Sequence, residues 1–175
     1  MTVQGYSRYV HRHIIQTLNE IDPQSFAAVP QLADLPAVFA KPDGGVDYTF
    51  QIRENATWPD GSQVTAYDVV FSLKILFNPL LEETGVYLLY YAMIGGVKLT
   101  PANAKQIKIM TNLPYILSEA ALGSLPVYPK YVYDPDGLLD NIRLSDLLNA
   151  AKAESMAKNN TELQSFAEQF SDPAY

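Results

Sequence analysis

Cysteine, long apolar runs and an excess of basic residues are all missing from this chain of 175 residues. Without cysteine there is no disulfide and no thiol catalysis, but the compartment stays open, because many periplasmic proteins also lack cysteine. No stretch approaches the ~20 continuous apolar residues of a membrane span. The longest candidate, Val86 to Ile94, is too short and contains three tyrosines. The formal net charge of −7 argues against nucleic acid as a partner, because phosphate binding requires a concentrated basic surface.

The composition is that of a folded globule. Hydrophobic residues make up 48% of the chain and charged residues 18%, which is enough apolar material for a sizeable core. The length fits a single domain, residues 1–175, or one compact lobe of a larger protein. The first residues show no basic region followed by an apolar one, so we expect no signal peptide in this sequence.

The first half of the chain shows one clear strand and one clear helix. Alternating apolar residues predict a strand over Asp47 to Arg53, entered through a turn at Asp43-Gly44-Gly45. The range Thr65 to Asn78 predicts a helix with a wide, mostly buried apolar face. Apolar residues at helical spacing also predict a helix over Ser7 to Ile21. Ala27 to Ala40 is interpreted as a connector interrupted by Pro30 and Pro36, with a possible short helix.

The second half predicts a hairpin and several helices. Glu82 to Met93 is ambiguous, with helix favoured. Val97 to Thr100 and Gln106 to Met110 are expected to be strands around a turn at 101–103. Helices are expected over Pro114 to Leu122, Leu144 to Ala157 and Thr161 to Phe170, with a proline-containing segment over Leu125 to Asp136. This order predicts an α+β fold, in which helices cover one side of a small antiparallel sheet.

The most informative stretch joins a strand, a turn and a capped helix. It reads Tyr48-Thr49-Phe50-Gln51-Ile52-Arg53, then Trp58-Pro59-Asp60-Gly61, then Thr65-Ala66-Tyr67-Asp68-Val69 and Phe71-Ser72. Asp60-Gly61 predicts a turn, because Gly accepts the positive φ that other residues resist. Thr65 stands three residues before Asp68, so its hydroxyl is placed to cap the new helix.

This stretch resembles the signature of the peptide-binding and nickel-binding proteins of bacterial ABC importers, solute-binding protein family 5. That signature is roughly Y-T-F-x-L-R, W/F-x-D-G and T-A-x-D-V-x-F-S, and Ile52 replaces its usual Leu. Weaker similarities flank it. They are Leu18 to Asp22-Pro23 with Pro30-Gln31-Leu32-Ala33, Tyr128 to Tyr133, and Phe166 to Phe170. The family's next Gly-rich strand is absent before Tyr175, so the resemblance covers only an early part of a family chain.

The resemblance implies a transport role. It implies a subdomain of the first lobe of a periplasmic-binding-protein type II-like fold, hence a partial N-terminal lobe of a longer substrate-binding protein. Family members close two lobes over a ligand, most often a short peptide, and nickel chelates or sugars in others. It also implies an ABC permease as partner, export as a periplasmic or lipid-anchored extracellular protein, no enzymatic activity and no cofactor. Ligand-contacting residues stay unassigned, and truncation could expose a surface that dimerises.

Titratable residues give weak signals for catalysis or metal binding. His11 and His13 are two apart, and on a helix they would point to different sides, so they are interpreted as solvated or capping residues. Glu82-Glu83 and the carboxylates Asp134, Asp136 and Asp140 are interpreted as solvated or turn residues, because acid–base pairs are held across a cleft. We therefore expect no catalytic and no metal-binding residues. The sequons at Asn55 and Asn159 carry no function, and the second is expected to cap a helix.

Two aromatic features leave alternatives open. Trp58, the only tryptophan, could stack on a ligand, but its place beside the turn favours packing beneath it. Asp60, Gly61, Thr65 and Asp68 are interpreted as scaffold. The uncharged segment Val86 to Met93 is interpreted as either a core helix or an interface with the rest of a parent chain.

Two further functions compete with transport. One is a stand-alone protein-interaction module with an apolar aromatic surface. The other is a hydrolase whose residues are too widely spread to recognise, although the chain has neither a G-x-S-x-G elbow at Gly123 to Leu125 nor a phosphate-binding loop.

Overall fold

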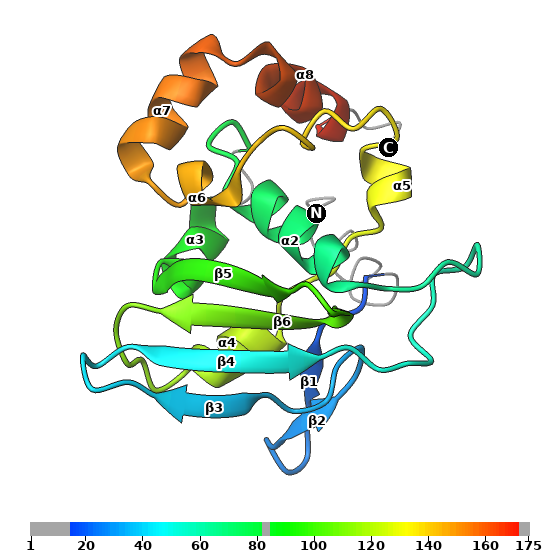
Figure 1. Ribbon diagram of the computed structural model, residues 1–175, viewed down its shortest axis with the longest axis vertical. Coiled ribbons are helices and arrows are strands. Elements are labelled where there is room, and N and C mark those ends of the chain that lie inside the picture. Colours follow the sequence, from blue (N-terminus) through cyan, green and yellow to red (C-terminus); the bar gives the residue numbers. More distant parts are fainter. Residues whose placement is uncertain (1–14, 82–84, 172–175) are drawn as a thin grey trace, which may run out of the picture.

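The computed structural model describes residues 15–81 and 85–171. Its strands are β1 (Asn19–Ile21), β2 (Ala28–Pro30), β3 (Ala37–Ala40), β4 (Val46–Gln51), β5 (Ile94–Thr100) and β6 (Asn103–Thr111). Its helices are α2 (Ala66–Leu76), α3 (Gly85–Tyr91), α4 (Ser118–Gly123), α5 (Lys130–Tyr133), α6 (Leu144–Leu147), α7 (Ala150–Asn159) and α8 (Thr161–Phe170). Figure 1 shows α6, α7 and α8 gathered at the end of the molecule farthest from β1 and β2.

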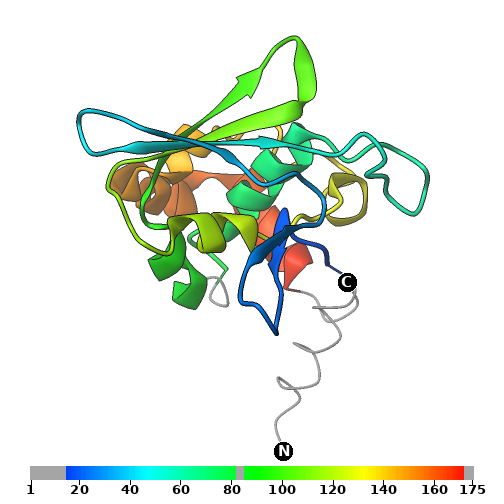
Figure 2. The same ribbon diagram turned by 90° about the horizontal axis from the view of Figure 1, so that it is seen from below.

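The main sheet is four-stranded and antiparallel, with the order β3-β4-β6-β5. A separate two-stranded sheet pairs β1 with β2. Figure 2 shows the helices lying on one side of the main sheet. The other side is polar, and there Asp47 lies between Lys41 at 3.4 Å and Lys108 at 3.5 Å. The fold is therefore α+β with helices on one side of an antiparallel sheet, as the sequence predicts.

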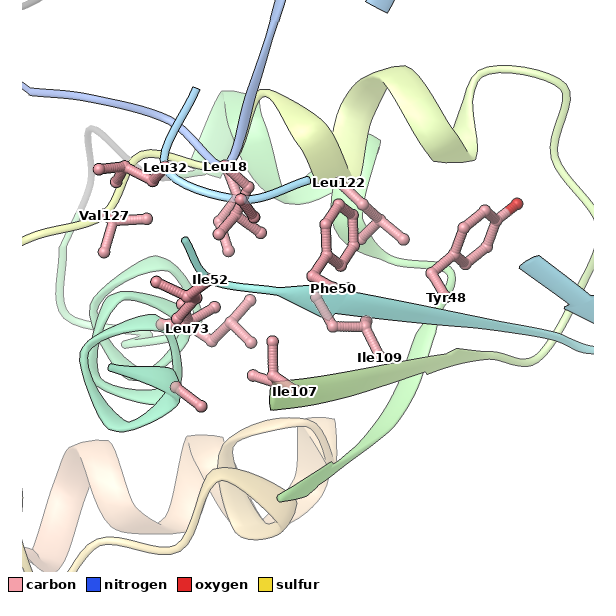
Figure 3. Packing of buried hydrophobic residues seen from close by; sticks show 14 of the residues in the cluster. Leu18, Leu32, Tyr48, Phe50, Ile52, Leu73, Ile107, Ile109, Leu122 and Val127 are labelled. Carbon is pink, nitrogen blue, oxygen red and sulfur yellow. The ribbon is translucent and has the colours of Figure 1, made fainter. Parts of the chain in front are cut away.

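Buried apolar residues at every second position of β4 and β6 form the face of the sheet that the helices cover. Tyr48, Phe50 and Ile52 are buried, while the residues between them are half-buried or exposed. Ile107 and Ile109 are fully buried on the paired strand β6. Figure 3 shows these side chains meeting Leu73 of α2 and Leu18, Leu32, Leu122 and Val127 from other parts of the chain. Period-2 patterning thus places one row of each strand in the core.

Helix α2 is buried on two sides. Val69 and Leu73 belong to the core cluster that faces the sheet. Phe71 and Ile75 belong to a second cluster formed with α8 and the segment around Leu139. The Phe71 ring packs edge-on against Phe166 of α8, with the ring centroids 6.1 Å apart. The wide apolar face predicted for this helix therefore serves two cores.

Residues Thr65 and Asp68 form a capping box at the start of α2. The carboxylate of Asp68 accepts hydrogen bonds from the backbone N–H of Thr65 at 2.8 Å and from its hydroxyl at 3.0 Å. A carboxylate in the first turn also complements the helix dipole. The predicted helix start at Thr65 is confirmed, and both residues act as scaffold.

The predicted helix over Ser7 to Ile21 is wrong for residues 15–21, which are the described part of that range. Thr17 bridges Pro126, and the next residues form β1, paired with β2. The buried amide of Asn19 donates to the carbonyls of Leu18 and Ala33, both at 2.9 Å. The long-range bond to Ala33 and the pairing of β1 with β2 override the local helical spacing. Residues 7–14 of that prediction lie outside the described residues.

Three further predictions need correction. The connector over Ala27 to Ala40 contains the strands β2 and β3 instead of a short helix. The predicted helix over Pro114 to Leu122 begins only at Ser118. The predicted helix over Leu144 to Ala157 is split into α6 and α7, because Asn149 caps the second helix by accepting a hydrogen bond from Lys152 N–H at 3.1 Å.

Candidate functional site

An exposed apolar surface lies on the helix-bearing side of the sheet. We define this apolar surface by six side chains from α3 and from the segment before α4: Leu89, Tyr90, Leu113, Tyr115, Ile116 and Leu117. Ile116 is 95% exposed and Leu89 is 82% exposed. Helix α3 contacts α4, and both lie beneath the sheet in Figure 2. Exposed apolar residues on neighbouring elements are typical of a surface that meets a ligand or another protein segment.

The segment Val86 to Met93 has one buried side, as the core interpretation predicts, and one exposed side. Tyr91 is buried, and Leu88 packs against the main core, so one side of α3 is a core face. Leu89 and Tyr90 point the other way and are exposed. Helical geometry separates the two sets, because residues three apart share a face and the two between them turn away. The described part of α3 contains no charged residue.

The structure supports the packing interpretation of Trp58. It is half-buried and packs against the main core cluster. The same residue borders a hollow of about 500 Å³, lined by Trp58, Ser62, Gln63, Thr65, Asp68, Lys130, Tyr131, Asp134 and Pro135. Its backbone N–H donates to the Ser62 carbonyl at 2.8 Å, which closes the turn around it. Packing and turn formation account for these contacts.

The predicted turn at Asp60-Gly61 is present. Gly61 has a φ of +86°, a conformation that a side chain would strain. The carboxylate of Asp60 accepts hydrogen bonds from the Ser62 hydroxyl at 2.7 Å and from its backbone N–H at 2.9 Å. The bond from the hydroxyl is the larger cause and the bond from the backbone N–H the smaller one. Together they hold the pKa of Asp60 below its usual value of 3.8.

The Asp60 turn gives a testable pH dependence. A carboxyl group whose pKa is lower in the folded state contributes stability above its unfolded pKa, and that contribution is lost as the pH falls through the folded pKa. We expect a carbon-detected NMR titration to place the pKa of Asp60 below 3.8, and Ser62→Ala to raise it towards 3.8. The pKa of Asp22, which is lowered by its own contacts with Ser25, serves as the internal control and should not move. An unchanged Asp60 pKa in Ser62→Ala would contradict the assigned cause.

Lys105 is a structural residue that sequence reasoning missed. It is 9% exposed, and its Nζ donates to Gln63 Oε1 at 2.6 Å. The same Nζ lies 3.4 Å from the carbonyl oxygens of Arg53 and Ala56. Lys105 therefore ties both sides of the loop that carries Trp58 to strand β6. Lys105 lies two residues before the buried Ile107, so the alternation of the strand could have placed it on the inner face. The predicted strand began at Gln106, one residue after Lys105.

The carboxylates Asp134, Asp136 and Asp140 form no acid–base pair. Asp134 is 1% exposed, and its two oxygens accept hydrogen bonds from Leu138 N–H at 2.6 Å and Leu139 N–H at 3.0 Å. Asp136 is exposed, and Asp140 forms an ion pair with Lys130 at 2.8 Å. Asp134 thus holds the loop that follows α5, in agreement with its interpretation as a turn residue.

The remaining candidates do not gather into a site. His11, His13, Glu82 and Glu83 lie outside the described residues. Within 15–81 and 85–171, no three His, Asp or Glu side chains are grouped as a metal would require. In the same ranges, no helix has the length and apolar character needed to cross a membrane. Asn160 of the second sequon caps α8 as predicted, accepting a hydrogen bond from Leu163 N–H at 2.7 Å.

Comparison with protein families gives one match over most of the chain. Residues 27–165 match the model of the bacterial extracellular solute-binding proteins, family 5. The periplasmic oligopeptide-binding protein OppA of Salmonella typhimurium is 40% identical over 50 residues, which are 29% of this chain and 9% of that protein. The oligopeptide-binding protein OppA of Bacillus subtilis is 31% identical over 81 residues, 40% of this chain and 15% of that protein. The chain thus spans a small part of the length of these relatives.

Solved structures of solute-binding proteins also superpose on this chain. NikZ from Campylobacter jejuni, in complex with Ni(L-His), superposes with a TM-score of 0.56 at 26% identity, covering 75% of this chain and 24% of that one. The oligopeptide-binding protein from Thermus thermophilus, complexed with a pentapeptide, gives a TM-score of 0.59 at 15% identity, covering 93% of this chain and 30% of that one. The second likeness concerns the fold alone, and it extends over nearly all of the present chain.

Proposed function

This chain belongs to the bacterial extracellular solute-binding proteins, family 5, and on that basis we propose that it forms part of the substrate-binding receptor of an ABC importer. The proposed cargo is a short peptide. The apolar surface of α3 and the segment before α4 is proposed as one wall of a cleft that a second lobe completes. We further propose that the parent is exported and delivers its cargo to an ABC permease.

The single observation that carries this proposal beyond family membership is the apolar surface itself. It exposes two tyrosines and four aliphatic side chains, none of them charged. Peptide receptors of broad specificity use main-chain hydrogen bonds together with roomy apolar pockets for side chains. An uncharged surface suits such a pocket because it imposes no demand on the charge of the cargo. It also suits a contact with the remainder of a longer chain.

The proposal assigns this chain a binding role and no catalytic one. The family consists of solute-binding proteins. Of the described carboxylates that the sequence singled out, Asp134 is held by backbone N–H groups and Asp140 by Lys130, while Asp136 is exposed on the surface. None of the three faces another carboxyl group across a cleft in the way that acid–base catalysis requires. A binding role uses surfaces of this kind, whereas catalysis requires reactive groups that face one another across a cleft.

The proposal predicts little peptide affinity for the 175-residue chain alone, because one wall leaves most of a ligand in water. We expect calorimetric titration with a library of short peptides to show no heat of binding up to about 1 mM peptide, against the ~1 μM dissociation constants common for specific sites. Micromolar binding by this chain alone would overturn the assignment of a single wall.

A second measurement separates a receptor part from a stand-alone interaction module. The downstream lobe of a family member, supplied in trans, should co-elute with the chain in size-exclusion chromatography. Leu89→Lys and Ile116→Lys should abolish that association, because each places a charge in the apolar surface. Phe26→Lys, at a side chain 79% exposed in the β1–β2 loop, is the matched control and should leave it intact. Failure of the lobes to associate would favour the interaction module.

A further inference from the structure

The sequence Pro-Asp-Gly occurs three times in this chain, and each copy forms the same turn. In chain order, the Gly N–H donates to the carbonyl of the residue before the proline at 3.1, 2.9 and 3.2 Å. This is a β-turn with Pro at its second position and Gly at its fourth. Every one of these glycines has a positive φ, and every one of the aspartates is exposed. The turns are Lys41 to Gly44, Trp58 to Gly61 and Asp134 to Gly137.

The first two turns hold their aspartate side chain in place. The N–H two residues after the aspartate bonds back to its carboxylate, from Gly45 to Asp43 at 3.0 Å and from Ser62 to Asp60 at 2.9 Å. The Ser62 hydroxyl adds a second bond to Asp60 at 2.7 Å. Local bonds of this kind are the usual reason for aspartate in turns, and they restrict the rotation of the carboxylate.

The third turn lacks this bond because another carboxylate takes its donor. Leu138 N–H, the equivalent group, donates to Asp134 at 2.6 Å. Lys41 and Trp58 hold the place of Asp134 in the other two turns, and neither side chain has an acceptor atom for an N–H group. Within residues 15–81 and 85–171, no donor is bonded to the Asp136 carboxylate. This side chain is therefore exposed and free to rotate, directly before a glycine.

We propose that Asp136 is a site of spontaneous isomerisation to isoaspartate, and that the fold makes it react faster than Asp43 and Asp60. The Gly137 nitrogen attacks the side-chain carbonyl carbon of protonated Asp136. The new N–Cγ bond forms while the hydroxyl leaves with the amide proton as water. Solvent water then opens the five-membered imide by breaking the bond between that nitrogen and the former main-chain carbonyl carbon. The chain now runs through Cβ and Cγ, with composition and charge unchanged.

The other two aspartates are hindered at the first step of this reaction. Hydrogen bonds from N–H and O–H groups favour the ionised carboxylate, whereas the reaction consumes the protonated form. The Ser62 hydroxyl and then its N–H hold the pKa of Asp60 below 3.8, so its reactive form is rarer. Asp43 must also give up a bond before its side chain can turn. The bond that the Gly137 nitrogen must leave, to the Asp134 carbonyl, is the longest of the three at 3.2 Å.

Isomerisation would loosen the loop that Asp134 closes. It inserts a methylene group into the main chain between Asp134 and Leu138, inside the ring that the bond between these two residues completes. Leu139 N–H bonds to the same carboxylate at 3.0 Å, and the Leu139 side chain is 1% exposed in the second core cluster. A lengthened chain would not present both N–H groups to the carboxylate as before. Aged protein should therefore unfold at a lower urea concentration than fresh protein.

Prolonged incubation of the 175-residue chain at mildly acidic pH, followed by peptide mapping, tests the proposal. An isoaspartyl peptide elutes apart from its parent at the same mass. We expect Asp136 to convert at least ~10-fold faster than Asp60, with Asp43 between them, because each bond to a charged carboxylate that must break raises the barrier. Asp136→Glu keeps the charge but would have to close a six-membered ring, so its peptide should stay unchanged and the aged variant should keep its urea midpoint.

Two controls separate the fold from the local sequence. In urea above the unfolding transition, the three peptides should convert at similar rates, because all share Pro-Asp-Gly. Ser62→Ala leaves Asp60 with one backbone bond and should raise its rate towards that of Asp43. Conversion of Asp43 or Asp60 ahead of Asp136 in the folded chain overturns the proposal. So does a preference for Asp136 that persists in urea, because its cause would then lie in the neighbouring Leu138 and not in the hydrogen bonds.

Discussion

Replacing Phe50 by alanine is expected to lower the free energy of unfolding by about 3–5 kcal/mol. Phe50 is fully buried at the centre of the sheet face that meets α2 and α4, and Figure 3 shows it among Leu122, Ile107 and Ile109. The substitution removes the transfer free energy of the ring and leaves a cavity that neighbouring side chains fill only in part. Since domains of this size are stable by ~5–15 kcal/mol, the loss would be a large share of the total.

The measurement is urea denaturation followed by Trp58 fluorescence and by circular dichroism at low protein concentration. Phe39→Ala is the matched control, because Phe39 lies on the neighbouring strand and is 65% exposed. It should change the free energy of unfolding by no more than about 0.5 kcal/mol. Equal losses in the two variants would mean that the core does not lie between β4 and the helices as described.

Replacing Asp134 by alanine is expected to lower the free energy of unfolding by about 2–4 kcal/mol. Its carboxylate accepts hydrogen bonds from the N–H groups of Leu138 and Leu139, and the second of these bonds is buried. Alanine would leave both donors without an acceptor, in a place that water reaches poorly. The loop that follows α5 would then lose its attachment beside the second core cluster.

Asp136→Ala is the matched control for this prediction. Asp136 belongs to the same loop, is exposed, and its replacement changes the net charge by the same amount. Chemical denaturation should show Asp136→Ala within about 0.5 kcal/mol of the unmodified chain. Asp134→Asn, which keeps one acceptor oxygen, should fall between the two alanine variants. If both alanine variants lose the same stability, the effect comes from net charge and not from the buried hydrogen bonds.

Local patterns predicted those elements that carry a clear period, turn or cap in their own sequence. Strand β4, its turn at Gly44 and helix α2 with its cap at Thr65 each depend on a period or a turn within a few residues. The β5–β6 hairpin was found for the same reason. Its strands begin earlier than predicted, at Ile94 and Asn103, because backbone pairing continues past the residues with clear alternation.

Elements fixed by distant contacts could not be read from the sequence. Strand β1 has helical spacing of its apolar residues, yet it is held by bonds from Asn19 to Ala33 and from Val127 to Gln16. The apolar surface was found only in part. The segment Val86 to Met93 was singled out, but Tyr115 and Ile116 were assigned to a helix that begins only at Ser118, and Leu113 was not singled out. Exposure depends on what covers a residue in three dimensions, and a linear pattern does not contain that information.

The attachment of the Trp58 loop to Lys105 has a practical consequence for protein engineering. Arg53 and Ala56 on one stem and Gln63 on the other converge on a single ammonium group, whereas the exposed tip at Asp60 and Gly61 makes hydrogen bonds only within its own turn. Exposed tips on anchored stems are the places where chains accept foreign segments. An epitope or a fluorophore-binding peptide spliced between Asp60 and Gly61 would therefore leave the sheet undisturbed.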